Sequence, residues 1–128
     1  MDIKDFYLEG TKNTPEIQFR CNGNMLIKGR SIPEDPAKFY VVIEGWVKDY
    51  ALNPQALTTI DIELEYFNSG SSKSLLLIFR DLSEVCNNGH KLVINWYYEE
   101  GDDDILERGE YYASLVNAKF NFIEVKQA

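Results

Sequence analysis

A strict alternation of apolar and acidic residues between Thr59 and Phe67 limits what this chain can fold into. Side chains two residues apart lie on the same face of a β-strand. One face of this segment would carry Ile60, Ile62, Leu64 and Tyr66, and the other Asp61, Glu63 and Glu65. The segment therefore predicts a half-buried strand with an acidic outer face.

Helical and extended patterns alternate on both sides of this strand. Helices are predicted where apolar residues recur every three or four positions, and their stripes are Phe39, Ile43, Trp46 and Tyr50, then Leu75, Phe79, Leu82 and Cys86, then Ile105, Leu106, Gly109 and Tyr112. Asp35-Pro36 is typical of a helix start, and Gly89 of a helix stop. Further strands are predicted at residues 6–8, 16–21, 25–28, 91–98 and 120–125, with a hairpin turn at Asn22-Gly23. The order β-β-β-α-β-α-β-α-β predicts an α/β fold, in which residues 1–128 form a single domain with a mixed β-sheet packed against about three helices.

Composition restricts the class of partner. The chain has 128 residues and a formal net charge of −8, with no cluster of Lys and Arg. Binding to nucleic acid or to an anionic membrane surface needs such a cluster, so neither partner is expected. The N-terminus lacks the pattern of a signal peptide, and Cys21 and Cys86 are expected to be reduced thiols. We therefore expect a cytoplasmic protein without a cofactor.

Enzyme signals in the sequence are weak. His90 is the only histidine, so a histidine-based zinc site is excluded, and no glycine-rich phosphate loop is present. A metal-dependent enzyme would have to use Glu99, Asp102 or Asp104. The acidic stretch does not have the spacing of a calcium loop, and a simpler interpretation is that Asp103 and Asp104 stabilise a helix start. No metal or catalytic residue is predicted.

The turn between the strand ending at Phe67 and the next helix is the most informative site. Three hydroxyls lie within four positions (Ser69, Ser71 and Ser72), Gly70 leaves the backbone unobstructed, and Lys73 lies in the first helical turn. Free backbone N–H groups at a helix start attract anions, and a phosphoserine suits such a place. Ordinary helix capping by one serine is the alternative explanation. The residues alone leave both open.

Several short motifs in one order resemble the SiaC family of bacterial regulatory phosphoproteins. The likeness extends from about Phe6 to Glu124. Its motifs are Thr14-Pro15, Gly29-Arg30-Ser31-Ile32-Pro33-Glu34, Tyr66-Phe67-Asn68-Ser69 through Lys73, Asn95-Trp96-Tyr97-Tyr98-Glu99, Asp102-Asp103-Asp104 and Gly109-Glu110. Such an ordered set is more specific than any single motif.

The resemblance implies a STAS-like fold and a protein in a bacterial partner-switching pathway. A serine/threonine protein kinase would phosphorylate it and a metal-dependent protein phosphatase would restore it. The unphosphorylated form would bind an effector such as a diguanylate cyclase and so control cyclic di-GMP signalling and biofilm or aggregation. The alternative is an unregulated protein- or ligand-binding domain in which Ser69 is a structural helix cap.

The resemblance also assigns the site residues. It places the phosphoacceptor at Ser69, ahead of Ser71 and Ser72, where the family has Thr. Asn68 and Gly70 would shape the loop, and Lys73 could pair with the phosphate. The sequence departs from the family at Gly70, which is usually Ser, and at Ile32, which is usually Tyr.

Overall fold

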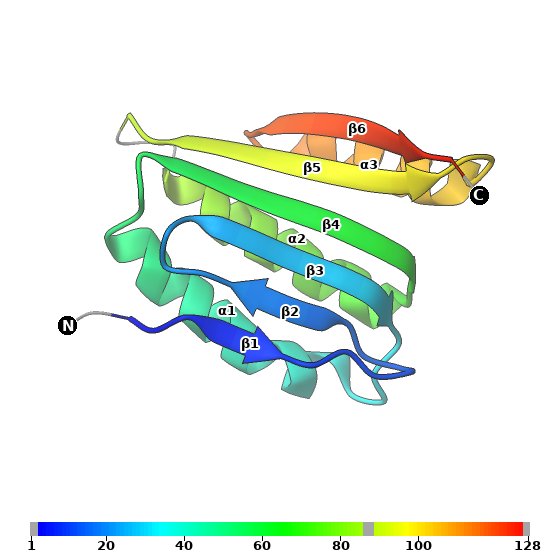
Figure 1. Cartoon of the computed structure of the whole chain (residues 1–128), viewed down its shortest axis with the longest axis horizontal. Coiled ribbons are helices and arrows are strands. Elements are labelled where there is room, and N and C mark those ends of the chain that lie inside the picture. The colour runs from blue at the N-terminus through cyan, green and yellow to red at the C-terminus, as the bar shows by residue number, and fades with distance from the viewer. Residues whose placement is uncertain (1–2, 86–88, 127–128) are drawn as a thin grey trace.

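In the computed structural model of this protein, which describes residues 3–85 and 89–126, six strands form one mixed β-sheet with three helices packed on it (Figure 1). The strands lie in chain order across the sheet, from β1 at one edge to β6 at the other. The elements are β1 (Phe6–Leu8), β2 (Glu16–Phe19), β3 (Asn24–Ser31), α1 (Pro36–Leu52), β4 (Leu57–Phe67), α2 (Ser69–Ser83), β5 (Lys91–Glu99), α3 (Asp103–Leu115) and β6 (Lys119–Val125). The predicted fold class and element order are confirmed.

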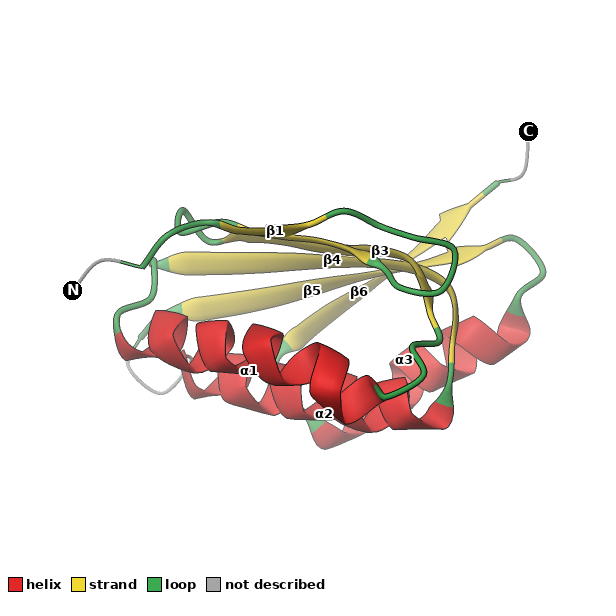
Figure 2. Cartoon of the chain, turned by 90° about the horizontal axis from the view of Figure 1, so that it is seen from below, coloured by secondary structure: helices red, strands yellow, loops and turns green. Residues whose placement is uncertain are grey.

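The sheet changes from antiparallel to parallel at β3. Strands β1, β2 and β3 form an antiparallel meander, whereas β3, β4, β5 and β6 are parallel and each connection between them contains one helix. All three helices lie against the same face of the sheet (Figure 2). Because each helix follows the carboxyl end of a parallel strand, α1, α2 and α3 all begin at the same edge of the sheet and run in the same direction.

The start of α1 is set by local chemistry. The side chain of Asp35 accepts a hydrogen bond from the backbone N–H of Lys38 (3.2 Å), and Pro36 occupies the first turn. Both features were predicted from the sequence, since Asp is favoured as an N-cap and Pro at the first helical position.

None of the helices in residues 3–85 and 89–126 combines the length and apolar character that crossing a membrane requires.

The predicted alternation of β4 is right up to Leu64 and wrong at Tyr66. Gly29 of β3 lies opposite Leu64, but Arg30 lies opposite Tyr66, so β4 contains one extra residue at Glu65. Such a β-bulge reverses the faces that the following side chains occupy. Tyr66 is consequently 45% exposed, and Phe67 takes its place in the core with no exposed surface.

Helix α2 ends earlier than the sequence predicts. Its regular part stops at Ser83, whose hydroxyl donates to the backbone oxygen of Arg80 (2.6 Å), so a side chain competes there for a helix carbonyl. Gly89 has the left-handed conformation of a stop (φ 81°) but comes six residues after the helix. The predicted core position of Cys86 lies outside the described residues.

A close contact in the core joins α3 to β5. Trp96 is fully buried, and its indole N–H donates to the backbone oxygen of Ile105 (2.9 Å). Gly109 lies over the same ring, because a Cβ atom added there would be only 2.5 Å from the indole nitrogen. The ring of Tyr112 follows one turn later, with its centroid 5.5 Å from that of Trp96. Gly109 therefore lets α3 approach the sheet closely.

The face of the sheet away from the helices is polar at its centre. Asn95 of β5 lies opposite Asp61 of β4 and Asn121 of β6. The amide of Asn95 donates to a carboxylate oxygen of Asp61 (2.8 Å), and the amide of Asn121 donates to the side-chain oxygen of Asn95 (3.0 Å). The predicted acidic outer face of β4 is thus present and connects three neighbouring strands.

Candidate functional site

Ser69 is the first residue of α2 and is exposed to solvent. The residue before it, Asn68, is the N-cap, and its side-chain oxygen accepts a hydrogen bond from the backbone N–H of Ser71 (2.9 Å). The alternative prediction, in which Ser69 itself caps the helix, is therefore wrong. The capping bond needs an acceptor one position earlier, and Asn68 supplies it.

The second hydroxyl of the loop, that of Ser71, is buried in a hydrogen-bonded chain. Ser71 has no exposed surface, and its hydroxyl donates to the backbone oxygen of Ser31 (3.0 Å). The hydroxyl of Ser31 donates to that of Ser71 (2.8 Å), so its own oxygen accepts from Tyr40 at 2.6 Å. Burial raises the pKa of Tyr40 to about 12, which keeps this phenol protonated as a donor. Ser71 thus ties α2 to β3 and α1.

The third hydroxyl, that of Ser72, is engaged with α3. It lies 2.8 Å from the hydroxyl of Tyr112, which also donates to the backbone oxygen of Ser72 (2.8 Å). Burial raises the pKa of Tyr112 to about 12, so its hydroxyl remains a hydrogen-bond donor even in mildly alkaline solution. Of the three hydroxyls that the sequence brings together, Ser71 and Ser72 hold α2 in place, and Ser69 faces solvent.

The charge around the start of α2 differs from that of the other two helices. Helices α1 and α3 begin on the carboxylates Asp35 and Asp102, whereas α2 begins on a neutral amide and has no acidic residue in its first turn. Lys73 is exposed one turn after Ser69, and residues four apart on a helix are neighbours on its surface. The partial positive charge of this helix end is therefore not offset by a carboxylate of its own helix.

Gly70 sets the distance between α2 and the start of α1. A Cβ atom added at Gly70 would lie 2.7 Å from the Cγ atom of Pro36. A side chain at this position would therefore push the two helix starts apart.

Arg108 of α3 also reaches the turn, and the sequence analysis missed it. Its Nη1 atom donates to the backbone oxygen of Phe67 (2.7 Å), and its Nε atom is 3.4 Å from a carboxylate oxygen of Asp104. The guanidinium carbon lies 4.5 Å from the ring centre of Phe67 and 5.7 Å from that of Tyr66. A cation from another helix therefore contacts the residue two positions before Ser69.

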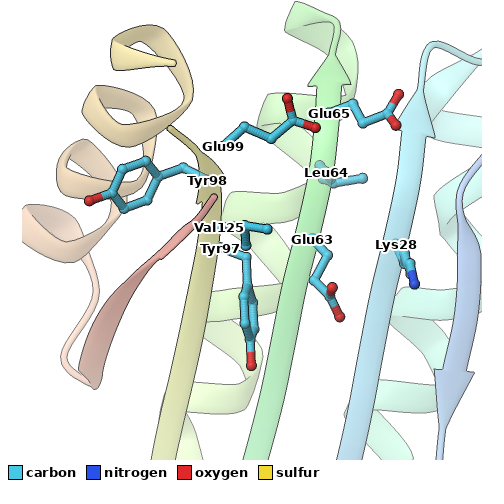
Figure 3. Close-up of a pocket in the computed structure, with 8 residues that line it drawn as sticks. All are labelled: Lys28, Glu63, Leu64, Glu65, Tyr97, Tyr98, Glu99 and Val125. Atoms are coloured by element: carbon cyan, nitrogen blue, oxygen red, sulfur yellow. The ribbon is translucent and has the colours of Figure 1, made fainter. Parts of the chain in front are cut away.

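The acidic residues considered for a metal-dependent enzyme have separate surroundings. Asp102 caps α3 by accepting from the backbone N–H of Ile105 (3.1 Å), Asp104 faces Arg108, and Glu99 lines a pocket on the open face of the sheet (Figure 3). Asp103 and Asp104 lie in the first turn of α3, as predicted. Within residues 3–85 and 89–126, no three His, Cys, Asp or Glu side chains are grouped to hold a metal ion.

The pocket of Figure 3 was not predicted from the sequence. It lies between Glu63 and Glu65 of β4 and Tyr97 and Glu99 of β5, with Lys28 of β3 at one side. Partial burial, together with the nearby carboxylates of Asp61 and Glu63, raises the pKa of Tyr97. The alternation of β4 predicts its carboxylates on this face, but the pocket itself depends on strands that are far apart in the chain.

Two substitutions separate the structural role of the cap from the role of the exposed serine. Asn68→Ala should lower the free energy of unfolding by about 1 kcal/mol, because it removes the capping bond to Ser71. Ser69→Ala should change it by less than about 0.5 kcal/mol, as expected for an exposed position. Urea denaturation of the purified variants measures both values. A larger loss for Ser69→Ala than for Asn68→Ala would contradict the assignment of the cap.

Comparison with known proteins finds a matching family and similar folds. Residues 8–125 match the family described as SiaC family regulatory phosphoprotein. The chain is 26% identical over 111 residues to an uncharacterised protein of Pseudomonas aeruginosa strain UCBPP-PA14, covering 86% of this chain and 88% of that protein. Its fold is similar to that of apo-SiaC from P. aeruginosa, with a TM-score of 0.85, 24% identity and coverage of 94% of this chain and 99% of the other.

A second solved structure shows a related chain with a partner. It is the crystal structure of the P. aeruginosa diguanylate cyclase SiaD in complex with its activator SiaC, and the matching chain has a TM-score of 0.87 and 24% identity, over 94% of this chain and all of the other. The match to the family extends over most of the described structure. The present chain belongs to the SiaC family of regulatory phosphoproteins.

Proposed function

We propose that this protein is a phosphorylation-controlled binding protein and not an enzyme, and that Ser69 is its phosphoacceptor. The observation that carries the proposal is the different state of the three serines. Ser69 is exposed at the helix start, whereas Ser71 is fully buried and Ser72 is bonded to Tyr112. A kinase needs an accessible hydroxyl, and modification of either of the other two would break contacts that hold α2 against its neighbours.

The proposed partners are those of a switching pathway. A serine/threonine protein kinase adds the phosphate, a metal-dependent phosphatase removes it, and the unmodified protein binds an effector, for which a diguanylate cyclase is the leading candidate. Support comes from the P. aeruginosa complex, in which SiaC is the activator of such an enzyme. In this proposal residues 1–128 act as one regulatory domain that controls cyclic di-GMP formation.

The proposed mechanism is electrostatic. The effector covers the exposed start of α2 when Ser69 is unmodified. A phosphate adds about −1.5 to −2 charges and three strong acceptors, and burying such a group beneath an effector is costly even when a cation pairs with it. Phosphorylation therefore releases the effector.

The test uses three variants produced with an affinity tag in the source organism. Ser69→Ala should retain a co-purifying diguanylate cyclase, and Ser69→Asp should recover at least tenfold less of it, as measured by quantitative mass spectrometry. Ser114→Asp is the matched control, because Ser114 is also exposed but lies near the end of α3, so it adds the same charge at another place.

Site-resolved mass spectrometry of the unmodified sequence completes the experiment. Phosphate on Ser69 is the expected result. Equal recovery of the cyclase with Ser69→Ala and Ser69→Asp, or absence of phosphate on Ser69 under all growth conditions, would overturn the proposal.

A further inference from the structure

Arg108 lies level with the start of α2, although it comes 39 positions after Ser69 in the chain. The hydroxyl of Tyr112 contacts Ser72. Arg108 is one turn before Tyr112 on α3, and Ser69 is one turn before Ser72 on α2. Because the two helices run in the same direction, going back one turn on each brings Arg108 to the level of Ser69. The bond from Arg108 to the backbone oxygen of Phe67 (2.7 Å) fixes it at this level.

The guanidinium group of Arg108 has a defined position, but some of its hydrogen-bond donors have no partner in the described part of the chain. Arginine has five N–H donors, and Arg108 bonds Phe67 through Nη1 and faces Asp104 through Nε, while Nη2 has no hydrogen bond to any residue in the described part of the chain. The guanidinium carbon also lies over the rings of Phe67 and Tyr66, 4.5 Å and 5.7 Å from their centres. A partly free fork is therefore held beside the turn that contains Ser69.

The ion pair between Arg108 and Asp104 is weak. Asp104 is four residues before Arg108 on an exposed helix surface, with 69% of its side chain accessible. Exposed ion pairs of this kind contribute little. A phosphate carries up to twice the charge of a carboxylate and accepts two parallel hydrogen bonds from arginine. A phosphate on Ser69 would therefore compete successfully with Asp104.

We propose that Arg108 is the internal receptor of the phosphate on Ser69, with Lys73 as a second cation. This inference rests on the proposed function, in which Ser69 is the phosphoacceptor. Modification draws the fork of Arg108 away from Asp104 and links the start of α2 to the first turns of α3 by a charged bond. The unmodified state lacks this link, so an effector meets a different arrangement of α2, α3 and the exposed Tyr66 ring in the two states.

The test measures the phosphate itself in the isolated protein. The full chain is made with phosphoserine incorporated genetically at position 69, and the phosphate is titrated by ³¹P NMR. A nearby cation favours the doubly charged form and lowers the phosphate pKa from its ordinary value of about 6. Arg108→Gln should raise this pKa by about 0.5 or more relative to the phosphorylated wild type.

Three further variants make the result specific. Asp104→Asn should lower the pKa further, because it frees Arg108 and removes a like charge. Arg108→Lys keeps the charge without the fork and should give an intermediate value, and Arg80→Gln is the matched control because it removes an exposed positive charge from the last turn of α2. Circular dichroism checks that each variant is folded.

The outcomes test the role of Arg108 separately from the proposed phosphorylation-controlled binding. A phosphate pKa that is the same in wild type and in Arg108→Gln, or an equal change in Arg80→Gln, would overturn the role of Arg108. That result would leave the proposed function intact, because release of the effector is measured independently with the Ser69 variants. If Ser69→Asp does not release the effector while Arg108→Gln still raises the phosphate pKa, the proposed function is overturned and the receptor role of Arg108 is retained.

Discussion

Gly109→Ala is expected to lower the free energy of unfolding by about 2–4 kcal/mol. The added methyl group would lie 2.5 Å from the indole nitrogen of Trp96. The ring is fully buried and cannot move aside without breaking its bond to the backbone oxygen of Ile105. Alanine favours a helix over glycine by about 1 kcal/mol, which offsets only part of the loss. Urea denaturation monitored by tryptophan fluorescence measures the change.

Gly45→Ala is the matched control for this substitution. Gly45 lies inside α1, is exposed, and has no atom within 4 Å of the position that a Cβ would occupy. The same chemical change should therefore stabilise the protein by up to about 1 kcal/mol. Opposite signs at the two positions would show that contact with Trp96, and not helix propensity, decides the outcome. A neutral Gly109→Ala would mean that α3 lies farther from β5.

Ser31→Ala should have the second largest effect, a loss of about 1–3 kcal/mol. Ser31 and Tyr40 have no exposed surface, and the Tyr40 hydroxyl depends on Ser31 as its acceptor at 2.6 Å. Removing the serine oxygen leaves a buried phenolic donor without a partner, which costs more than the bond alone would contribute. Denaturation of the purified variant gives the value.

A double-mutant cycle with Tyr40→Phe identifies the cause. In the wild type, Tyr40→Phe should cost about 1 kcal/mol, because Ser31 keeps its hydrogen bond to Ser71. In the Ser31→Ala background the same change removes the orphaned hydroxyl and should cost much less. Strictly additive effects would contradict the hydrogen bond between the two residues.

Local patterns account for most of the fold. The alternation in β4 identified a strand with an acidic outer face, and Asp35-Pro36 identified the start of α1, because each pattern depends on neighbours in the chain. The bulge at Glu65 could not be predicted in this way. It is a mismatch between β4 and β3, and a single strand does not reveal where its partner lacks a residue. For the same reason Gly109 was assigned to the inward side of its helix, but its contact with Trp96 was not predicted.

The sequence identified only those residues of the site that are adjacent in the chain. Ser69, Ser71, Ser72 and Lys73 stood out because they are adjacent, yet their different roles depend on Ser31, Tyr40 and Tyr112 from other elements. Arg108 carried no signal, since an arginine four residues after an aspartate reads as an ordinary helix-surface pair. Its position beside Phe67 follows from the parallel course of α2 and α3. The assignment of Ser69 as phosphoacceptor stays a prediction.

The polar ladder of Asp61, Asn95 and Asn121 has a consequence for how β6 finds its place. Phe120 and Phe122 lie opposite Ile94 and Trp96 of β5, on the side of the sheet that faces the helices. Displacement of β6 by two residues could therefore keep an apolar face towards the helices and satisfy the hydrophobic pattern. The same displacement would separate the amide of Asn121 from Asn95. The polar groups on the solvent side thus select one register of β6 on β5 among alternatives that the core would tolerate. They do so at the last strand along the chain.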